Sequence, residues 1–166
     1  MDYIFAYDSP LGGITMASDG KSLTGLWFND QKYFAYTLSK DHIKKLLPVF
    51  EQTALWLDIY FSGKEPGFEP ELTLQGSEFR QSVWRVLRDI PYGKTITYGD
   101  IAETIAEEKG LPHMSAQAVG GAVGHNPISI IVPCYRVIGA HGSQTGYAGG
   151  IDKKLRLLQL EGALSC

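Results

Sequence analysis

The sequence has few cysteines and no pattern typical of a metal site. Only Cys134 and Cys166 occur among the 166 residues, and the second is the last residue given. A structural disulfide between them is disfavoured, because terminal residues are usually mobile and a reducing cytosol keeps thiols reduced. The four histidines are scattered and no Cys-x-x-Cys pair is present. We therefore expect no metal and no other cofactor.

Long apolar runs are also absent. No segment approaches the roughly 20 consecutive apolar residues that a membrane span needs. The first residues lack the basic stretch followed by an apolar stretch that marks a secretory signal. Apolar and charged fractions of 44% and 20% are typical of a soluble globular protein. These features predict a cytoplasmic protein with no membrane partner.

A strong positive charge is the third absence. The net charge of −3 argues against bulk electrostatic attraction to nucleic acid. Residues 1–75 contain 6 Lys and Arg against 10 Asp and Glu, whereas residues 76–166 contain 9 against 8. If the protein binds DNA, residues 76–166 are therefore the better candidate, and local geometry must supply most of the recognition.

Residues 1–75 have the pattern of a small α/β domain. Helical spacing of apolar residues predicts one helix over 43–61, and the Pro- and Gly-rich stretch 63–76 predicts a linker. Short apolar and aromatic runs separated by turn residues predict an antiparallel sheet, with strands at 3–7, 14–17 and 23–28.

Residues 76–166 have a mainly helical pattern, so the chain as a whole is predicted to be α+β. An extended apolar run over 128–132 and a glycine-rich loop over 139–150 interrupt the helices. Two short helices joined by a tight connection favour a helix-turn-helix, although any small helical bundle fits the same pattern. Helices are expected after the N-cap Ser77, over 98–106, over 115–124 and after a cap at Asp152.

The helix predicted over 115–124 contains three Ala and three Gly among its ten residues, and Gln117 is its one long polar side chain. Each glycine inside a helix costs up to about 1 kcal/mol relative to alanine, so this composition needs a compensating reason. Close packing on another helix is one reason and the simpler one from the pattern alone. Close approach to a narrow surface such as the DNA minor groove is the other.

Cys134 follows an apolar run and Pro133, which is the usual setting of a buried structural cysteine. Polar neighbours favour a nucleophile instead: Tyr135 and Arg136 follow it directly, and Asn126 provides an amide at a nearby turn. A nucleophilic thiol must ionise before it attacks, which needs a base or a cationic neighbour. Arg136 fits an ordinary ion-pair role equally well.

These residues resemble the O6-alkylguanine-DNA alkyltransferase family, also called methylated-DNA–protein cysteine methyltransferases. Residues 1–75 resemble the family's small variable α/β domain in layout only. The matching segments run in order over residues 79–162: Ile90-Pro91-x-Gly93, Thr97-Tyr98-Gly99-Asp100-Ile101-Ala102, Ala118-Val119-Gly120-Gly121-Ala122, Asn126-Pro127, Val132-Pro133-Cys134-x-Arg136-Val137, Gly146-Tyr147-Ala148-Gly149-Gly150, Leu157-Leu158 and Glu161-Gly162.

The resemblance implies domains at 1–75 and 76–166, the second a winged helix-turn-helix that binds the minor groove of double-stranded DNA. A monomer is expected to rotate an O6-alkylguanine out of the base stack, with O4-alkylthymine as a second candidate substrate. Cys134 would then keep the alkyl group after a single turnover.

The resemblance also assigns roles within the site. Tyr98 would lie near the rotated nucleotide, and Ala118 and Gly121 would let the helix approach the groove. Asn126 would be the hinge residue, Tyr147, Ala148 and Gly149 would cover the base, and Glu161 would end a proton relay. Arg136 would be a structural arginine after the active centre, and it is counted among the residues that bind DNA or the base.

Two positions depart from the family pattern. Tyr135 stands where the family usually has a histidine that relays the thiol proton, and a phenol with a pKa near 10 is a poor base. Gln117 stands where the family usually has an arginine that enters the base stack. The main alternative is an alkylguanine sensor with little or no transfer, although such alkyltransferase-like proteins usually lack the cysteine. A cysteine hydrolase would need a poised histidine, and no such signature surrounds His125 or His141.

Overall fold

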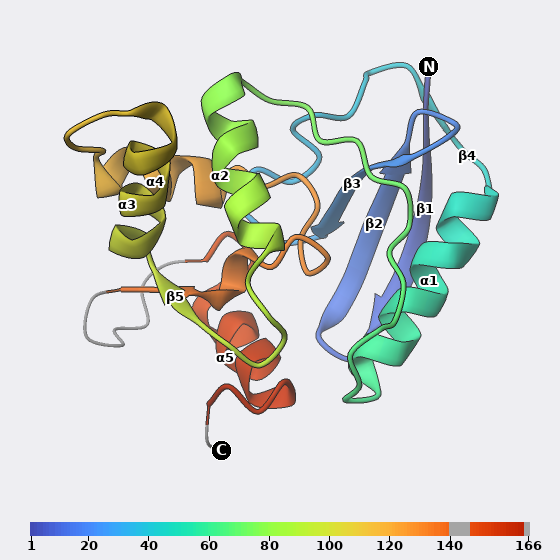
Figure 1. Cartoon of the computed structure of the whole chain (residues 1–166). Coiled ribbons are helices and arrows are strands. Elements are labelled where there is room, and N and C mark those ends of the chain that lie inside the picture. The colour runs from blue at the N-terminus through green and yellow to red at the C-terminus, as the bar shows by residue number, and fades with distance from the viewer. Residues whose placement is uncertain (140–146, 165–166) are drawn as a thin grey trace. The chain divides into compact units, whose positions relative to one another are not determined.

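The computed structural model describes residues 1–139 and 147–164 (Figure 1). The chain forms two compact units. The first comprises Met1–Gln75 and Pro127–Ile131, and the second comprises Gly76–Asn126 and Val132–Cys166. One unit contains a sheet with a helix and the other is mainly helical, so the predicted α+β class is confirmed.

The first unit contains a four-stranded sheet in the order β3-β2-β1-β4. Its bounds are Asp2–Ser9 for β1, Gly12–Ser18 for β2, Leu23–Phe28 for β3 and His42–Lys44 for β4. The three predicted strands pair antiparallel, as expected from the short turns between them. Strand β4 was not predicted, and it pairs parallel to β1 with Tyr3 opposite Ile43.

Helix α1 spans Pro48–Phe61, so the prediction that it begins at residue 43 was wrong. Proline disfavours helical geometry in the residue before it and is well suited to the first helical turn, which explains why the helix begins at Pro48. The helix packs on β1 and β3 through buried side chains that include Phe50, Leu57 and Tyr60. The hydroxyl of Tyr7 on β1 donates a 2.6 Å hydrogen bond to Asp58 on α1.

The segment Pro127–Ile131 joins the first unit along β3. The amide of Leu26 donates to Pro127 O at 2.8 Å, and the amide of Ser129 donates to Leu26 O at 2.9 Å. Ile130 has φ of 70°, a rare conformation for a β-branched residue. The amide of Ile131 donates to Ser129 O at 2.8 Å and closes a γ-turn there. The expectation that 128–132 is extended throughout was therefore wrong.

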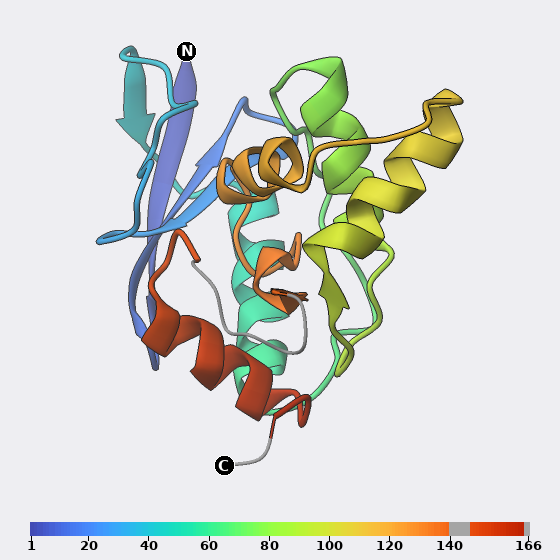
Figure 2. The ribbon, with the colours of Figure 1, turned by 90° about the vertical axis from the view of Figure 1, so that its left-hand side faces the viewer.

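The second unit is built on three helices that pack against one another, α2 (Glu78–Arg88), α3 (Tyr98–Lys109) and α4 (Ala116–Gly124) (Figure 2). The hydroxyl of Ser77 accepts from the amide of Arg80, which confirms the predicted N-cap of α2. Trp84 of α2 is 1% exposed, and its indole nitrogen donates to Ala122 O on α4 at 2.8 Å.

The rest of the second unit forms around a short 3-10 helix, η1, over Cys134–Arg136. Strands β5 (Ile96–Thr97) and β6 (Val137–Ile138) pair in parallel, and the final helix α5 (Ile151–Leu160) packs on η1. Gly150, with φ of 102°, is the N-cap of α5, so the cap predicted at Asp152 was wrong. In the described ranges no helix is long and apolar enough to cross a membrane.

Candidate active site

Cys134 is the first residue of η1 and is only 5% exposed. The amide of Cys134 donates to Val132 O at 2.9 Å across Pro133, so the chain turns sharply just before the thiol. The side-chain amide of Asn126 donates to the same Val132 carbonyl at 2.7 Å. Asn126 therefore braces the turn that presents the cysteine.

Burial raises the pKa of the Cys134 thiol to about 11, because an apolar environment disfavours the charged thiolate. Hydrogen bonding from the Asn126 side chain, the charge of Lys154 and the backbone amides of Cys134 and Tyr135 act in the opposite direction and lower this pKa. Cys134 is consequently a neutral thiol at neutral pH, and its reaction as a nucleophile requires ionisation within the site.

Tyr135 and Arg136 both bind Glu161, which follows α5 directly. The Tyr135 hydroxyl donates a short hydrogen bond to Glu161 Oε2. Arg136 donates from Nε to Glu161 Oε1 at 2.9 Å and from a terminal guanidinium nitrogen to Oε2 at 3.1 Å. The side chains of Arg136 and Glu161 are 10% and 0% exposed. The result is a buried charge pair with a phenol hydrogen-bonded to it.

The Ile90-Pro91-x-Gly93 segment completes this network. The carbonyl of Ile90 accepts from Arg136 at 2.8 Å, and the amide of Gly93 donates to Glu161 Oε1 at 3.0 Å. Gly93 has φ of 78°, and a Cβ at this position would lie 3.2 Å from Glu161 O. The positive φ strongly favours glycine at this position, and the close Glu161 carbonyl also disfavours a larger residue. Sequence analysis did not single out Ile90 or Gly93 as site residues, although the segment was part of the family resemblance.

Lys154 on α5 is a second residue that sequence analysis missed. It is 0% exposed, and its ammonium donates to Val137 O at 2.6 Å. Burial lowers its pKa, and the negative charge of an ionised Cys134 raises it. The spacing to Leu157 and Leu158, three and four residues later, was the available signal, because it puts Lys154 on the apolar face of the helix.

Helix α4 presents its small residues to solvent. Ala116, Gln117, Ala118 and Gly121 are exposed, whereas Val119, Ala122 and Val123 are buried. A Cβ added at Gly121 would meet no other heavy atom of the described residues within 4 Å. Internal packing, the simpler explanation from the sequence, therefore does not account for the glycine at this position.

Tyr98 is the first residue of α3 and lies beside α4. Thr97 and Asp100 form a capping box, in which Thr97 Oγ1 accepts from the Asp100 amide and Asp100 accepts from the Thr97 amide. The half-buried Tyr98 ring is 3.9 Å from the position that a Cβ on Gly120 would take. The local cap thus fixes where Tyr98 projects relative to the small-residue helix.

Tyr147 brings the segment before α5 to Tyr135, the residue after the cysteine. Its ring meets the Tyr135 ring edge to face, with centroids 6.4 Å apart. Ala148 is half-buried and Gly149 is buried. A Cβ on Gly149 would lie 2.5 Å from the Tyr147 ring, so a larger residue there would displace the ring. Most of the glycine-rich loop expected over 139–150 lies outside the described residues, which resume at 147.

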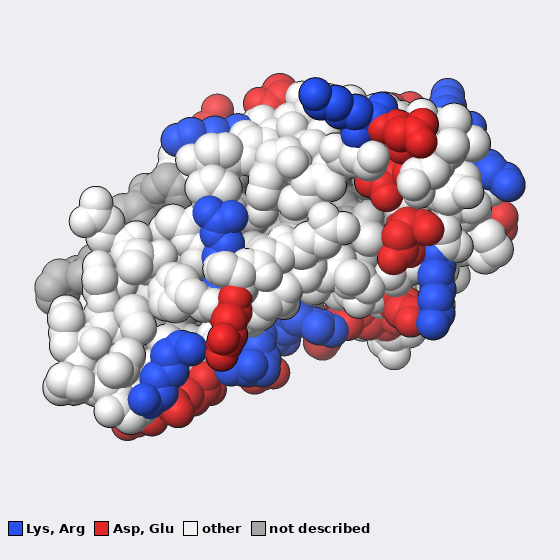
Figure 3. All heavy atoms as spheres, turned by 90° about the horizontal axis from the view of Figure 1, so that it is seen from above, with Lys and Arg blue, Asp and Glu red and all other residues white. Residues whose placement is uncertain are grey.

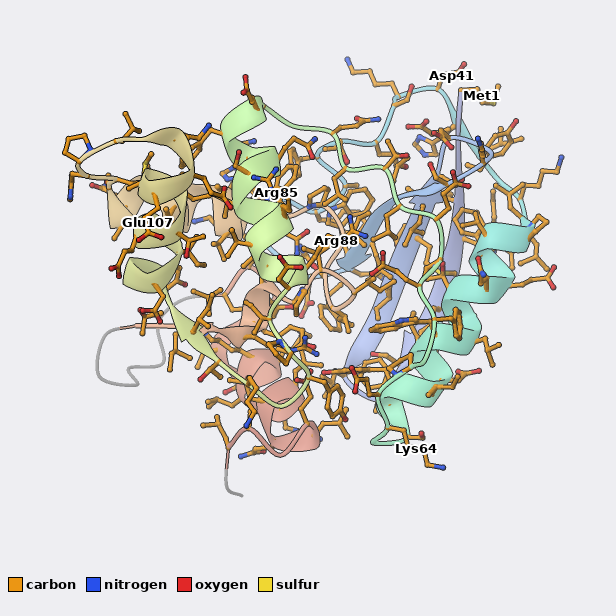
Figure 4. All side chains as sticks on the ribbon, in the orientation of Figure 1. Met1, Asp41, Lys64, Arg85, Arg88 and Glu107 are labelled. Atoms are coloured by element: carbon orange, nitrogen blue, oxygen red, sulfur yellow. The ribbon has the colours of Figure 1, made fainter. Side chains whose placement is uncertain are left out.

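Charged side chains are dispersed. On the face drawn in Figure 3, basic and acidic groups of the described residues alternate among uncharged ones. Arg85 on α2, labelled in Figure 4, pairs with Glu108 on α3 at 3.0 Å, so part of the positive charge is neutralised locally. The described part of the chain has no group of three or more residues that could hold a metal ion.

Comparisons with known proteins agree over both halves of the chain. Residues 3–74 match the family described as 6-O-methylguanine DNA methyltransferase, ribonuclease-like domain, and residues 78–163 match its DNA binding domain. A methylated-DNA–protein-cysteine methyltransferase of Mycobacterium tuberculosis is 47% identical over 154 residues, covering 93% of this chain and 88% of the relative. One from Methanosarcina acetivorans is 41% identical and covers 97% and 99%.

A solved structure supports the same relationship. The crystal structure of Mycobacterium tuberculosis OGT in complex with DNA has a TM-score of 0.82 to this chain and 44% sequence identity, covering 97% of this chain and 93% of the other. Sequence, fold and the order of the site residues around Cys134 therefore lead to one assignment: the chain belongs to the 6-O-methylguanine DNA methyltransferase family.

Proposed function

We propose that Cys134 is the residue to which this protein transfers an alkyl group from O6-alkylguanine in double-stranded DNA. As a member of its family, the protein repairs DNA by direct alkyl transfer to a cysteine. The observation that carries the assignment to Cys134 is its place at the turn braced by Asn126, beside the buried Tyr135–Glu161–Arg136 network. O4-alkylthymine is a second candidate substrate.

The proposed chemistry is a direct substitution. The Cys134 S–H bond breaks, the sulfur electron pair forms a bond to the alkyl carbon, and the C–O bond breaks with its electrons left on the guanine. The guanine gains one proton and the thiol loses one, so the overall reaction is balanced. The thioether has no route back to a thiol, and each molecule acts once.

The hydrogen-bond network around Glu161 holds η1 in place. It also provides a route for a proton during the transfer. The Tyr135 hydroxyl already donates a hydrogen bond to Glu161. The phenol can therefore pass its own proton to the carboxylate as it takes up another, and it need not be a strong base. Arg136 is assigned a positioning role, because its guanidinium is directed to Glu161 and to Ile90 O. Contact of Arg136 with DNA is not needed for this role.

DNA binding is assigned to the domain over 76–166, with α4 approaching the minor groove. The exposed small residues Ala118 and Gly121 permit close approach, and Gln117 enters the space left by the rotated base. Tyr98 contacts the rotated nucleotide from the start of α3, and the stretch from Tyr147 to Gly149 covers the base. The protein acts as a monomer in the cytoplasm.

The test is a mass measurement. We expect duplex DNA containing O6-methylguanine to add one methyl group to the peptide that contains Cys134, at most once per protein molecule. Cys134→Ser is the matched control, and Cys166→Ser is the second. Tight binding to the modified duplex with no added mass would contradict the transfer and support the alkylguanine sensor. Methyl addition at Cys166 instead would contradict the assignment to Cys134.

A further inference from the structure

We propose that the ring of Tyr135 holds Tyr147 in place and thereby limits the size of the O6-alkyl group that the site accepts. This inference rests on the proposed function, because it concerns the base that the segment from Tyr147 to Gly149 would cover. The proton route depends on the hydroxyl of Tyr135, whereas the size limit depends on its ring. The two roles can therefore be separated by substitution.

The ring of Tyr135 is held at two places. Tyr135 is 0% exposed, and its hydroxyl donates a short hydrogen bond to Glu161, whose side chain is also 0% exposed. The guanidinium carbon of Arg136 lies 5.4 Å from the centroid of the Tyr135 ring, within the range of a cation–π interaction. A buried ring that is held at its hydroxyl and on its face has little freedom to turn, so it forms a rigid wall.

Tyr147 packs against this wall. The two rings are 6.4 Å apart between centroids and 81° apart in plane, which is the edge-to-face arrangement that aromatic pairs favour. Tyr147 is also close to the backbone of Gly149, because a Cβ on Gly149 would lie 2.5 Å from one ring carbon and 3.2 Å from two others. The Tyr147 ring therefore cannot shift without disturbing one of these two contacts.

The alkyl group must come close to this pair of rings. Cys134 directly precedes Tyr135 in η1, and the alkyl carbon has to reach the Cys134 sulfur while the stretch from Tyr147 to Gly149 covers the base. A methyl group is small enough to react with both rings in place. A benzyl group extends further, so it requires movement of the Tyr147 ring and loss of its contact with Tyr135.

A histidine at position 135, which is usual in the family, would not restrain Tyr147 in the same way. An imidazole is a smaller ring with no hydroxyl at its far end, so it leaves space on the side toward Tyr147. The size limit is therefore a property of this chain, and it follows from the residue that departs from the family pattern.

The experiment compares two duplexes of one sequence, containing O6-methylguanine or O6-benzylguanine. The measured quantity is the ratio of the benzyl to the methyl single-turnover rate, followed from the mass of the Cys134 peptide. Losses that affect both duplexes equally, such as weaker folding or slower proton transfer, cancel in this ratio. Tyr135→His and Tyr147→Leu each remove the ring contact from one side. Tyr135→Phe is the matched control, because it retains the ring and removes the hydroxyl.

We expect Tyr135→His and Tyr147→Leu each to raise the ratio by about threefold to tenfold, the range that corresponds to loss of one edge-to-face contact. Tyr135→Phe slows both reactions and leaves the ratio unchanged. The double variant has the ratio of the single variants, because both changes remove the same contact. An unchanged or lower ratio in Tyr135→His would overturn the proposal, and so would single effects that multiply in the double variant.

A measurement on the free protein tests the ring contact without DNA. The NMR shifts of the Tyr147 ring protons should change in Tyr135→His and stay near the wild-type values in Tyr135→Phe, and equal shifts in all three proteins would overturn the contact. Tyr147 is half-buried, so Tyr147→Leu keeps the rate test available if Tyr135→His does not fold. Failure of the wild type to take up either alkyl group would instead contradict the proposed function.

Discussion

Replacing Glu161 by Gln removes one charge from the buried network and leaves its shape nearly unchanged. Glu161 accepts hydrogen bonds from Tyr135, from two nitrogens of Arg136 and from the amide of Gly93. Its side chain is 0% exposed and that of Arg136 is 10% exposed. Glu161→Gln therefore removes the carboxylate charge that faces a mostly buried guanidinium.

Removal of one partner from a buried ion pair typically costs about 3–5 kcal/mol of unfolding free energy, because the remaining charge stays desolvated. The new amide can still accept from Arg136, so we expect a loss of about 3 kcal/mol. Urea unfolding, followed by tryptophan fluorescence with a check that the slope is unchanged, measures the effect. Glu107→Gln, at an exposed position on α3, is the matched control and should stay within about 0.5 kcal/mol of the wild type (Figure 4).

The double variant Glu161→Gln with Arg136→Met gives the decisive comparison. If the cost comes from an uncompensated charge, removing both charges costs less than the sum of the two single losses. A loss below about 1 kcal/mol for Glu161→Gln, or simple additivity in the double variant, would refute the argument that this pair is a coupled buried unit.

Four further predictions concern binding and reactivity. Gly121→Ala should stabilise the fold by up to about 1 kcal/mol, since helices favour alanine and the new Cβ meets no atom from another part of the described chain within 4 Å. The same variant should weaken binding to duplex DNA. Unaltered affinity in a titration would contradict close approach of α4 to the groove. Gln117→Arg should raise duplex affinity and steepen its salt dependence, and an equal slope would contradict the role given to this position. Tyr135→His should speed single-turnover transfer and Tyr135→Phe should slow it; a His variant no faster than the wild type would contradict the relay argument. Because burial raises the pKa of Cys134 to about 11, the transfer rate should rise about tenfold per pH unit between about pH 7 and pH 9, so a flat profile would contradict a neutral resting thiol.

Local features of the fold were predictable because neighbouring residues determine them. Ser77 caps α2, Thr97 caps α3 and Ser115 caps α4, each through a hydrogen bond to an amide three residues later. The same holds for the turn residues between the first three strands. In each case the interacting groups are close in sequence, so their geometry does not depend on the rest of the chain.

Strand β4 and Ile130 could not be predicted in this way. Strand β4 has three exposed residues, and its partner Tyr3 is 40 positions away from Ile43, so no local pattern marks it. Ile130 adopts a positive φ although isoleucine disfavours it. A strained backbone conformation persists when contacts around it hold the chain in place. Here the hydrogen bonds from Leu26 to Pro127 O and from Ser129 to Leu26 O hold the segment that contains Ile130.

The sequence by itself determined the family, through ordered matches on both sides of Cys134, and those matches are the reason that Cys134 is proposed as the acceptor. It also determined that a tyrosine stands where an imidazole is usual. Only the tertiary structure decided what surrounds the thiol: the Glu161 carboxylate held by Arg136 and Gly93, and the choice of Lys154 over Lys153 as the buried lysine. The physical reason is that burial and charge pairing depend on which elements pack together. The spacing to Leu157 and Leu158 puts Lys154 on the apolar face of α5, but only the packing of α5 on η1 decides what that face meets.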